Sequence, residues 1–315
     1  VTSAVWSDAD GDGWVDLLVT HEWGPVKIFM NEEGRLKEYT DEAGLGDLLG
    51  WWNGIAARDI DNDGDIDYAV TNFGLNTKYK ASREKPAVLY YGDFGLQKRM
   101  HLVEGEYENE TLYPVRGRSC STSAIPQLAA KFETFHDFAL APLEEIYTGR
   151  RLQAAQRFEA NVLSSGLLIN DGDGHFDFQP LPRIAQAAPG FGIVLTEVNG
   201  DGNADIYLVQ NFYGPQPETG RMDGGVSLLL TGRGDGTFQP VWPNRSGLVV
   251  PGDAKALTAM DLNNDGWVDI YTGGRLWRND QGTYTFIRNH GMPSMEGLWA
   301  DYDNDGDLDL YVGNE

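Results

Sequence analysis

The chain has 315 residues, a length that suits one large domain or two ordinary ones. Its 48 acidic and 24 basic residues give a formal charge of −24, which argues against binding to nucleic acid or to an anionic membrane surface. Hydrophobic residues make up 41% of the chain, so we expect a folded core, and no apolar run approaches the roughly 18 residues of a membrane helix.

The first predicted elements are a strand, TSAVWS (2–7), an acidic stretch, DADGDGWVD (8–16), and a second strand, DLLVT (16–20). The acidic stretch recurs as DIDNDGDID (59–67), EVNGDGNAD (197–205), DLNNDGWVD (261–269) and DYDNDGDLD (301–309). Turns alone explain one such cluster, but five copies in one register, each followed by a strand-like run, indicate a repeated function.

Oxygen-rich side chains at alternate positions of a short loop suit Ca²⁺, which takes six to eight oxygen ligands. We expect side chains from positions 1, 3, 5 and 9 and a backbone carbonyl from position 7, with Gly at position 6 for the sharp turn. The candidate ligands in chain order are Asp8, Asp10, Asp12, Trp14 and Asp16; Asp59, Asp61, Asp63, Asp65 and Asp67; Glu197, Asn199, Asp201, Asn203 and Asp205; Asp261, Asn263, Asp265, Trp267 and Asp269; and Asp301, Asp303, Asp305, Asp307 and Asp309.

The loops are not EF-hands, because position 12 is Val, Leu or Thr and lies in a strand-like run instead of being the Glu that an EF-hand requires. They hold 20 of the 48 acidic residues, so five bound Ca²⁺ ions would change the formal charge from −24 to −14. Glu197 replaces the usual Asp at position 1, so we expect the loop at 197–205 to be the weakest of up to five sites.

A third strand and a tight turn follow each of four loops, as in KIFMNEEG (27–34), LLINDGDGHF (167–176), LLLTGRGDGTF (228–238) and LWRNDQGTYTF (276–286). Four antiparallel strands with the acidic loop between the first two make one unit. Short sheets of this kind, repeated along a chain, predict an all-β fold: a β-propeller of six or seven four-stranded blades, forming one domain over residues 1–315.

The repeated units resemble the FG-GAP/VCBS repeats of calcium-binding β-propellers. The segments GWWNGIAARDIDNDGDIDYAVTNFGLN (50–76) and YPVRGRSCSTSAIPQLAAKF (113–132) are most similar to bacterial secreted proteins of the ASPIC/UnbV and cartilage-acidic-protein type. The resemblance implies calcium binding and an extracellular or cell-surface location. In such relatives an acidic loop follows a segment like AVLYYGDFG (87–95), where this chain offers only Asp93, so we expect no calcium there.

Residues 126–163 have helical spacing and predict a helical insertion within the third blade, with Thr134 as a helix cap. Its Arg150, Arg151 and Arg157 form a basic spot, which is either a solvated helix face or a surface for a partner or for self-association. Residues 294–315 contain only a first and a second strand, so we expect an incomplete last blade. Together with Val1 in place of Met, this favours a trimmed chain over one completed by a neighbour.

Three function classes fit these features. The first is a secreted, non-catalytic binding or adhesion module stabilised by calcium, with a protein or carbohydrate as its ligand. The second is a structural subunit of an extracellular assembly, joined through the open last blade or the helical insertion. The third is a propeller-based polysaccharide lyase or glycosidase, for which the sequence offers no nameable catalytic residue. We favour the first class.

Overall fold

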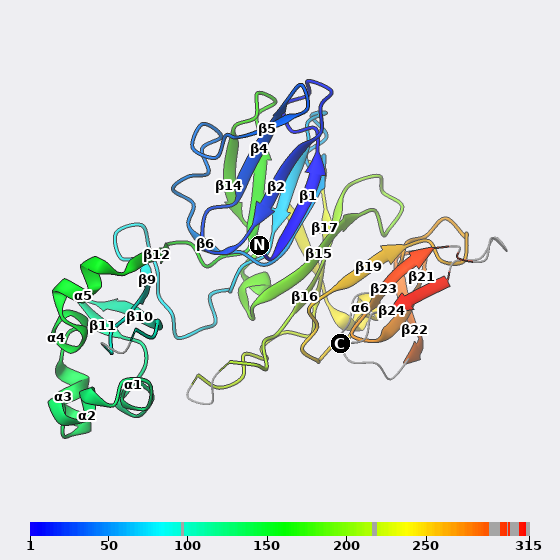
Figure 1. Cartoon of the computed structure of the whole chain (residues 1–315). Helices are drawn as coiled ribbons and strands as arrows, with labels where there is room; N and C mark the ends of the chain where they lie inside the picture. The colour runs from blue at the N-terminus through cyan, green and yellow to red at the C-terminus, as the bar shows by residue number, and fades with distance from the viewer. Residues whose placement is uncertain (96–97, 216–218, 290–296, 301, 303–308, 313–315) are drawn as a thin grey trace.

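A computed structural model describes residues 1–95, 98–215, 219–289, 297–300, 302 and 309–312. The fold is mostly β, and its sheets are antiparallel (Figure 1). Among the described residues, no helix is both long enough and apolar enough to cross a membrane.

Four sheets of four strands repeat one plan, in which the acidic loop joins the first strand to the second. In chain order, and given from the first strand to the fourth, they are β1 (Ser3–Ser7), β2 (Asp16–Thr20), β4 (Lys27–Glu32) and β5 (Arg35–Glu38); β7 (Ile55–Arg58), β8 (Asp67–Val70), β13 (Gly166–Asn170) and β14 (Phe176–Pro180); β15 (Gly190–Thr196), β16 (Asp205–Gln210), β17 (Leu228–Gly232) and β18 (Phe238–Val241); and β19 (Leu257–Met260), β20 (Asp269–Thr272), β21 (Arg275–Asp280) and β22 (Thr283–Asn289).

Two smaller sheets accompany them. The strands β23 (Gly297–Ala300) and β24 (Asp309–Val312) pair as the first two strands of a further unit, and β3 (Glu22–Gly24) pairs with β6 (Gly50–Trp51). The short helices η1 (Arg183–Gln186) and α6 (Pro243–Ser246) lie between units. We call these sheets and helices together the repeat body.

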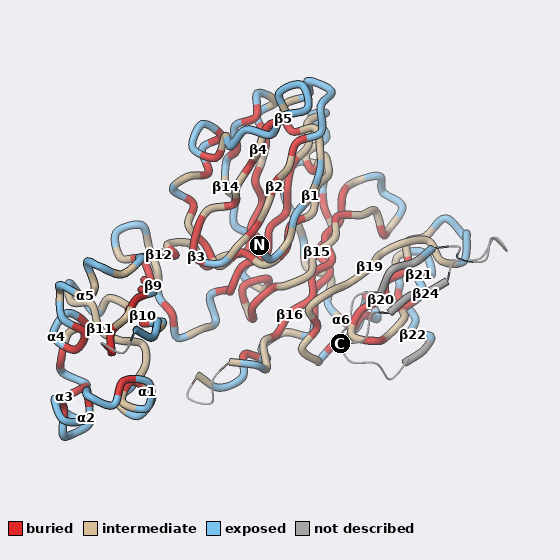
Figure 2. Tube along the Cα trace, viewed as in Figure 1, coloured by how far each residue is buried: buried red, intermediate tan, exposed pale blue. Residues whose placement is uncertain are grey.

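Alternate residues of the second strands enter different cores, because side chains of a strand point alternately to its two faces. In β8, Tyr68 and Val70 pack into the core against the first sheet, whereas Ala69 packs into the core against the third. Both faces of β8, β16 and β20 are therefore covered and these three strands are buried throughout, whereas Leu17 and Val19 of β2 are half-buried (Figure 2). The first strands contact one another in the order β1, β7, β15, β19, β23.

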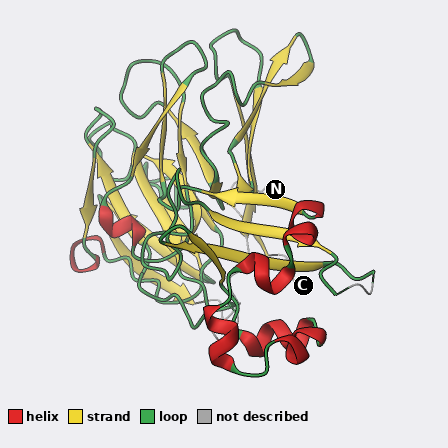
Figure 3. Cartoon of the chain, turned by 90° about the vertical axis from the view of Figure 1, so that its left-hand side faces the viewer, coloured by secondary structure: helices red, strands yellow, loops and turns green. Residues whose placement is uncertain are grey.

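A second unit interrupts the repeat body between β8 and β13, which pair directly although 95 residues separate Val70 from Gly166. It contains β9 (Ala87–Gly92), β10 (His101–Glu108), β11 (Thr111–Pro114) and β12 (Gln156–Ala160), with α1 (Arg118–Ala124), α2 (Gln127–Lys131), α3 (Phe135–Leu140), α4 (Leu143–Tyr147) and α5 (Gly149–Ala154). Residues 87–160 are called the inserted unit below. Figures 1 and 3 both show most of the helices gathered there, on one side of the molecule.

The inserted unit differs from the expected helical insertion at 126–163. Its helices run from Arg118 to Ala154, and residues 156–160 form β12, which pairs with β9. Four of its strands form a sheet of their own in the order β11-β10-β9-β12, which is unlike the order of the repeats. The sequence QRFEA (156–160) is compatible with a strand as well as with a helix. It forms a strand in the structure because it pairs with β9 and completes this sheet.

The inserted unit has its own core, which includes Val88, Phe138, Leu143 and Ile146. An aromatic cluster joins it to the repeat body. Trp51 stacks on Phe73 with ring centroids 4.2 Å apart, Tyr79 packs edge-on against both rings, and Trp23 lies 4.9 Å from Trp51. The same buried cluster includes Ala87 and Ala160 of the inserted unit, so these tryptophans lie at the joint between the two regions.

Candidate metal centre

The acidic loops at 8–16, 59–67, 197–205 and 261–269 each leave a first strand and enter the second strand beside it. The fifth loop lies largely outside the described residues. Of its predicted ligands, Asp301, Asp303, Asp305 and Asp307 are among the residues not described, and Asp309 begins β24. The placement of the four described loops agrees with the sequence prediction.

Two positions in each of the four described loops have a positive backbone φ, which curls the chain. Position 6 is always Gly, with φ between 84° at Gly202 and 103° at Gly64. Position 4 is Gly or Asn, with φ of 56° at Asn264 and 81° at Gly200. Because Asn tolerates the left-handed region better than other side chains with a β-carbon, position 4 varies between these two residues.

Side chains at the odd positions accept hydrogen bonds from backbone N–H groups further along the loop. The position-1 carboxylate accepts from the Gly at position 6, at 2.9 Å in Asp8, 3.2 Å in Asp59 and 2.7 Å in Asp261. The position-5 carboxylate accepts from position 7 in all four described loops. These contacts fix one oxygen of each side chain and hold the loop in a tight curl.

The first two loops bring three carboxylates together. One oxygen each from Asp8, Asp10 and Asp16 lie within 4.8 Å of one another, as do oxygens from Asp59, Asp61 and Asp67. In the part of the chain that the structure describes, these are the groups of three acids that could hold a metal ion. Oδ1 of Asp8 is also buried and accepts no hydrogen bond from the described residues, so it is an acceptor without a donor. A bound cation would supply the missing partner for that oxygen.

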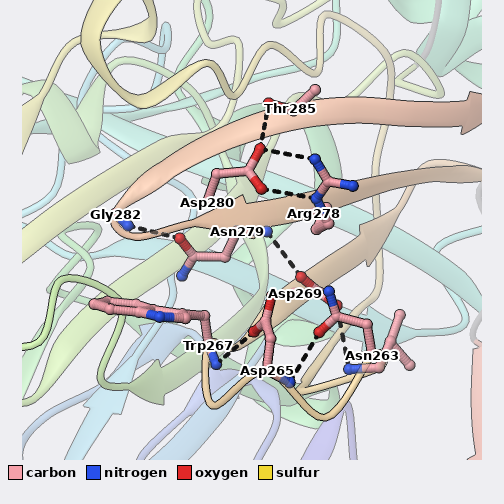
Figure 4. A network of polar contacts seen from close by, with 10 residues as sticks. Asn263, Asp265, Trp267, Asp269, Arg278, Asn279, Asp280, Gly282 and Thr285 are labelled. Carbon is pink, nitrogen blue, oxygen red and sulfur yellow. Dashed lines mark hydrogen bonds and ion pairs between the residues drawn. The ribbon is translucent and has the colours of Figure 1, made fainter.

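The third and fourth loops differ because Asn occupies position 3. Nδ2 of Asn199 donates to Asp201 at 3.1 Å, and Nδ2 of Asn263 donates to Asp265 at 2.8 Å (Figure 4). Glu197 accepts from Asn199 and Gly200 instead of from the Gly at position 6. The longer side chain thus bonds earlier in the loop, which is a physical reason to expect a weaker site there.

The position-9 aspartates have a second role that sequence reasoning did not predict. Both oxygens of Asp67 accept backbone N–H groups, one from Ile60 in the loop at 2.9 Å and one from Asn170 in the third strand at 2.9 Å. Asp16, Asp205 and Asp269 repeat both contacts. All four are buried, so each ties its loop to the third strand of its own sheet.

Burial of these carboxylates raises their pKa, because a charged group loses its hydration inside the protein. The pKa rises to about 6 in Asp67 and in Asp205, although the two N–H donors to each carboxylate lower it, and neighbouring loop acids raise it further. The pKa of Asp16 and of Asp269 is raised for the same main reason. A bound cation would offset this cost of keeping the carboxylates ionised.

Asparagines of the third strands tie consecutive units together, and this too was missed. Nδ2 of Asn170 donates to the carbonyl of Ala9, at position 2 of the preceding loop, at 2.7 Å. Nδ2 of Asn279 donates in the same way to Val198 at 3.0 Å. Figure 4 shows Asn279 between Gly282 and the loop at 261–269. The repeated N-D or N-E pair before the hairpin turn was the available signal, but it was interpreted as turn chemistry alone.

At the opposite ends of the first strands, buried threonines at the ends of the second strands bond to backbone carbonyls. The hydroxyl of Thr71 donates to the carbonyl of Phe191 in the next sheet at 2.6 Å, whereas that of Thr272 donates to Ala256, just before the first strand of its own sheet, at 2.7 Å. Beside them lies a cavity of about 480 Å³, lined by the beginnings of β1, β7, β15 and β19 and by the residues Thr2, Asn53, Phe191 and Lys255.

The amine of Lys255 lies 3.2 Å from the ring centroid of Phe191 and pairs with Asp253 at 2.5 Å. It also donates to the carbonyl of Asn211 at 3.0 Å. Burial lowers the pKa of Lys255, while Asp253 raises it. The cavity is therefore lined by hydroxyl, amide and aromatic groups and by the amine of Lys255, whose positive charge is partly neutralised by Asp253.

Comparison with solved structures finds rhamnogalacturonan lyases. The exotype rhamnogalacturonan lyase YesX matches over all of this chain and 45% of its own, with 14% identity and a TM-score of 0.43. The rhamnogalacturonan lyase YesW matches over 100% of this chain and 65% of its own, with 12% identity and a TM-score of 0.30. The Bacillus licheniformis rhamnogalacturonan lyase PL11 matches over 95% of this chain and 59% of its own, with 13% identity and a TM-score of 0.29. This chain thus spans about half to two thirds of these proteins. At these TM-scores the likeness supports no statement about activity.

Comparison with curated proteins gives no match. The family model of the FG-GAP-like repeat matches residues 8–70 and 219–272. The first range covers the loops at 8–16 and 59–67 and the strands from β2 to β8, and the second covers the loop at 261–269 and the strands from β17 to β20. The chain therefore carries FG-GAP-like repeats in the two segments where the acidic loops, the position-9 aspartates and the four-stranded sheets recur.

Proposed function

We propose that this protein is a calcium-stabilised β-propeller that acts as a non-catalytic binding module. The observation that carries the proposal is the convergence of three carboxylates in each of the first two loops, together with the buried Asp8 oxygen that lacks a donor. FG-GAP-like repeats commonly bind calcium, which agrees with this chemistry.

The metal would be held by the side chains at positions 1, 3, 5 and 9 of each loop and by the carbonyl at position 7. These are oxygen ligands, which Ca²⁺ prefers to nitrogen or sulfur. A bound ion would supply positive charge to the centre of the loop. The position-9 aspartates would carry its effect into the sheet, because each of them contacts both the loop and the third strand.

The propeller arrangement of six or seven blades is the finer part of the proposal. It is supported by the contacts of the first strands in the order β1, β7, β15, β19, β23, which is the order that radially repeated sheets require. The acidic loops follow the first strands at one end, and the cavity near Lys255 lies at the other. A protein or carbohydrate ligand is proposed for that opposite end.

We propose an extracellular location for this protein. Extracellular calcium modules have a Kd of about 10⁻⁴–10⁻³ M, which only extracellular calcium would saturate. The resemblance to secreted ASPIC/UnbV and cartilage-acidic-protein-like chains supports the same location. Secretion and the relation to these particular proteins are parts of the proposal.

The test is a calcium titration followed by calorimetry and by thermal unfolding in calcium, magnesium and chelator. We expect heat of binding and a higher Tm in calcium, and a smaller effect of magnesium, which demands a more regular octahedral site. Asp61→Asn should weaken one site, because Asp61 belongs to the second carboxylate group. Asp235→Asn is the matched control, since Asp235 is an exposed turn residue whose carboxylate bonds to Thr237.

An unchanged Tm in chelator would overturn the calcium proposal. The non-catalytic part has its own test, which is incubation of the calcium-loaded protein with a panel of polysaccharides. Unchanged chain length across the panel is the expected result, and release of unsaturated or reducing ends would contradict it.

A further inference from the structure

The third acidic loop, at 197–205, differs from the other described loops in three features at once. It has Glu197 at position 1, Asn199 at position 3 and Gly200 at position 4, a combination that no other described loop has. The Asn-Gly pair matters chemically, because the backbone nitrogen of a glycine, with no β-carbon beside it, reaches the side-chain amide of a preceding asparagine with the least steric hindrance. Gly200 is also exposed, so water reaches the pair.

The contacts of this pair supply the groups that such an attack needs. The N–H of Gly200 donates to Oε1 of Glu197 at 2.6 Å, so a carboxylate is in place to accept its proton. Oδ1 of Asn199 accepts the N–H of Asp201 at 2.9 Å, a bond that polarises the amide and would stabilise negative charge on that oxygen. A base and an oxyanion donor therefore flank the two atoms that would react.

The fourth loop shows what the base depends on. Oδ1 of Asn263 likewise accepts the N–H of Asp265, at 3.2 Å. However, position 4 is Asn264, and the carboxylate of Asp261 at position 1 accepts from Asp265 and Gly266 instead. The third loop combines a longer acid at position 1 with glycine at position 4, and only there among the described loops does the position-1 carboxylate contact the N–H of position 4.

A second Asn-Gly pair, Asn53-Gly54, lies outside the acidic loops. Gly54 is buried, and its N–H donates to the hydroxyl of Thr71 at 2.8 Å instead of to a carboxylate. Nδ2 of Asn53 donates to the carbonyl of Gly190 at 2.7 Å. Because a hydroxyl is too weak a base to accept an amide proton near neutral pH, this pair is a matched control within the same molecule.

We propose that Asn199 deamidates within the folded loop and that Glu197 acts as the general base. The nitrogen of Gly200 bonds to Cγ of Asn199, and its proton passes to Glu197. The bond between Cγ and Nδ2 then breaks, and the leaving nitrogen takes up that proton and departs as ammonia. Water opens the five-membered succinimide that remains and yields aspartate or isoaspartate at position 199.

The consequence for the loop rests on the proposed function. The aspartate product has a carboxylate at position 3, where the first two loops have Asp10 and Asp61. Deamidation to aspartate would thus give the loop that we expect to be weakest a stronger set of calcium ligands, whereas isoaspartate would lengthen its backbone by one methylene. Calcium should slow the reaction, since Glu197 would then serve as a metal ligand instead of a base.

The test is incubation of the full chain in chelator at neutral pH, followed by mass spectrometry of its peptides. We expect Asn199 to deamidate at least about tenfold faster than Asn53, because a positioned base contributes a factor of about 10²–10⁴. Glu197→Gln should remove most of this difference in the folded chain. In urea the carboxylate is no longer held beside Gly200, so both pairs should react at similar rates and Glu197→Gln should have no effect.

Two results would overturn the proposal. One is an Asn199 that stays intact in the folded chain while both pairs deamidate in urea, and the other is a Glu197→Gln chain that reacts as fast as the wild type or faster. Calcium affinity is measured apart from this by calorimetry of Asn199→Asp, which should bind more tightly than the wild type. Equal deamidation in calcium and in chelator, with unchanged affinity in Asn199→Asp, would contradict calcium binding by this loop but not the deamidation.

Discussion

The repeat body and the inserted unit differ in the interactions that stabilise them. The inserted unit contains eight basic and ten acidic residues, so it carries only −2 of the total charge of −24. The repeat body gathers acids in its loops, and in the first two loops oxygens of three carboxylates lie within 4.8 Å of one another. One region is thus an ordinary apolar core with helices around a sheet, and the other combines apolar cores with clustered charge that calls for a cation.

The comparison teaches that calcium and apolar packing should stabilise different parts of one chain. In the inserted unit, buried side chains such as Leu143 and Phe138 lie in one cluster, whose described members include no residue of the acidic loops. In the repeat body, each buried Asp at position 9 links a loop to a sheet. Experiments that act on charge and experiments that act on packing should therefore separate the two regions.

Removal of calcium has the largest expected effect. At a tenfold excess of calcium over Kd each site contributes about 1.4 kcal/mol, so up to five sites contribute roughly 7 kcal/mol. That is comparable to the whole stability of a typical protein, which is about 5–15 kcal/mol. Hydrogen exchange in chelator should rise in the repeat body and stay unchanged in the core of the inserted unit.

Equal loosening of both regions in chelator would contradict this picture, because it would mean that the aromatic joint at Trp51 makes them one cooperative unit. Exchange should be followed in peptides that contain β9 and β10 and in peptides that contain β8 and β16. The comparison within one sample needs no separate control.

The second prediction separates the stabilisation by the hydrogen bonds of the position-9 aspartate from the stabilisation by the bound metal. Asp67→Ala leaves the N–H groups of Ile60 and Asn170 without an acceptor, at a cost of about 1–3 kcal/mol each. Unfolding in urea should show a loss of roughly 3 kcal/mol even in chelator. Asp63→Ala is the control from the same loop: its carboxylate is exposed and accepts the N–H of Asp65, so the change should lower stability in calcium and little in chelator.

If the two variants lose the same free energy of unfolding in chelator, the hydrogen bonds of Asp67 contribute nothing to stability beyond metal binding. The structure would then overstate the role of the position-9 aspartates. Such a result would mean that the bound cation alone stabilises the loop.

The third prediction compares matched cavities in the two regions. Leu143 and Leu230 are both fully buried, one in the inserted unit and one in the repeat body. Each Leu→Ala change should cost about 3–5 kcal/mol. Added calcium should recover the stability of Leu230→Ala and leave that of Leu143→Ala unchanged, as followed by thermal unfolding; recovery of both would contradict the separation.

The sequence was informative where the pattern was local. The spacing of the acids placed each described loop between a first and a second strand, and the third strands lie where runs such as LLLTG predicted them. The position of the inserted unit was not local. It depends on the pairing of β8 with β13 across residues 71–165, and nothing in AVLYYG distinguishes a strand of the next repeat from a strand of a separate sheet.

The same limit explains the site residues that were missed. Asp67 was predicted as a ligand from its spacing, but its bond to Asn170 joins residues 103 positions apart. The bond from Asn170 to Ala9 spans 161 positions. A repeated side chain reveals such a contact only when the packing of one unit on the next is already known.

The last prediction is a pH dependence in chelator. The pKa of Asp67 and Asp205 is about 6 in the folded protein and 3.8 is the ordinary value, so between these limits the folded state binds more protons than the unfolded chain. The contribution of these two carboxyl groups to stability therefore falls as pH rises from about 4 to about 6 and is level above that range. Acids with a lowered pKa, such as Asp235 and Asp280, act below this window and with the opposite sign.

Calcium should remove this dependence, because a cation favours the ionised carboxylates whose burial otherwise costs free energy. Urea unfolding at pH 4.5, 5.5 and 6.5, with and without calcium, measures both effects. A stability that rises over this range in chelator would show that the backbone N–H donors to Asp67 and Asp205 outweigh their burial. In that case the loops would be stable as anionic sites without a metal, and the repeat body would differ from the inserted unit in charge but not in its need for calcium.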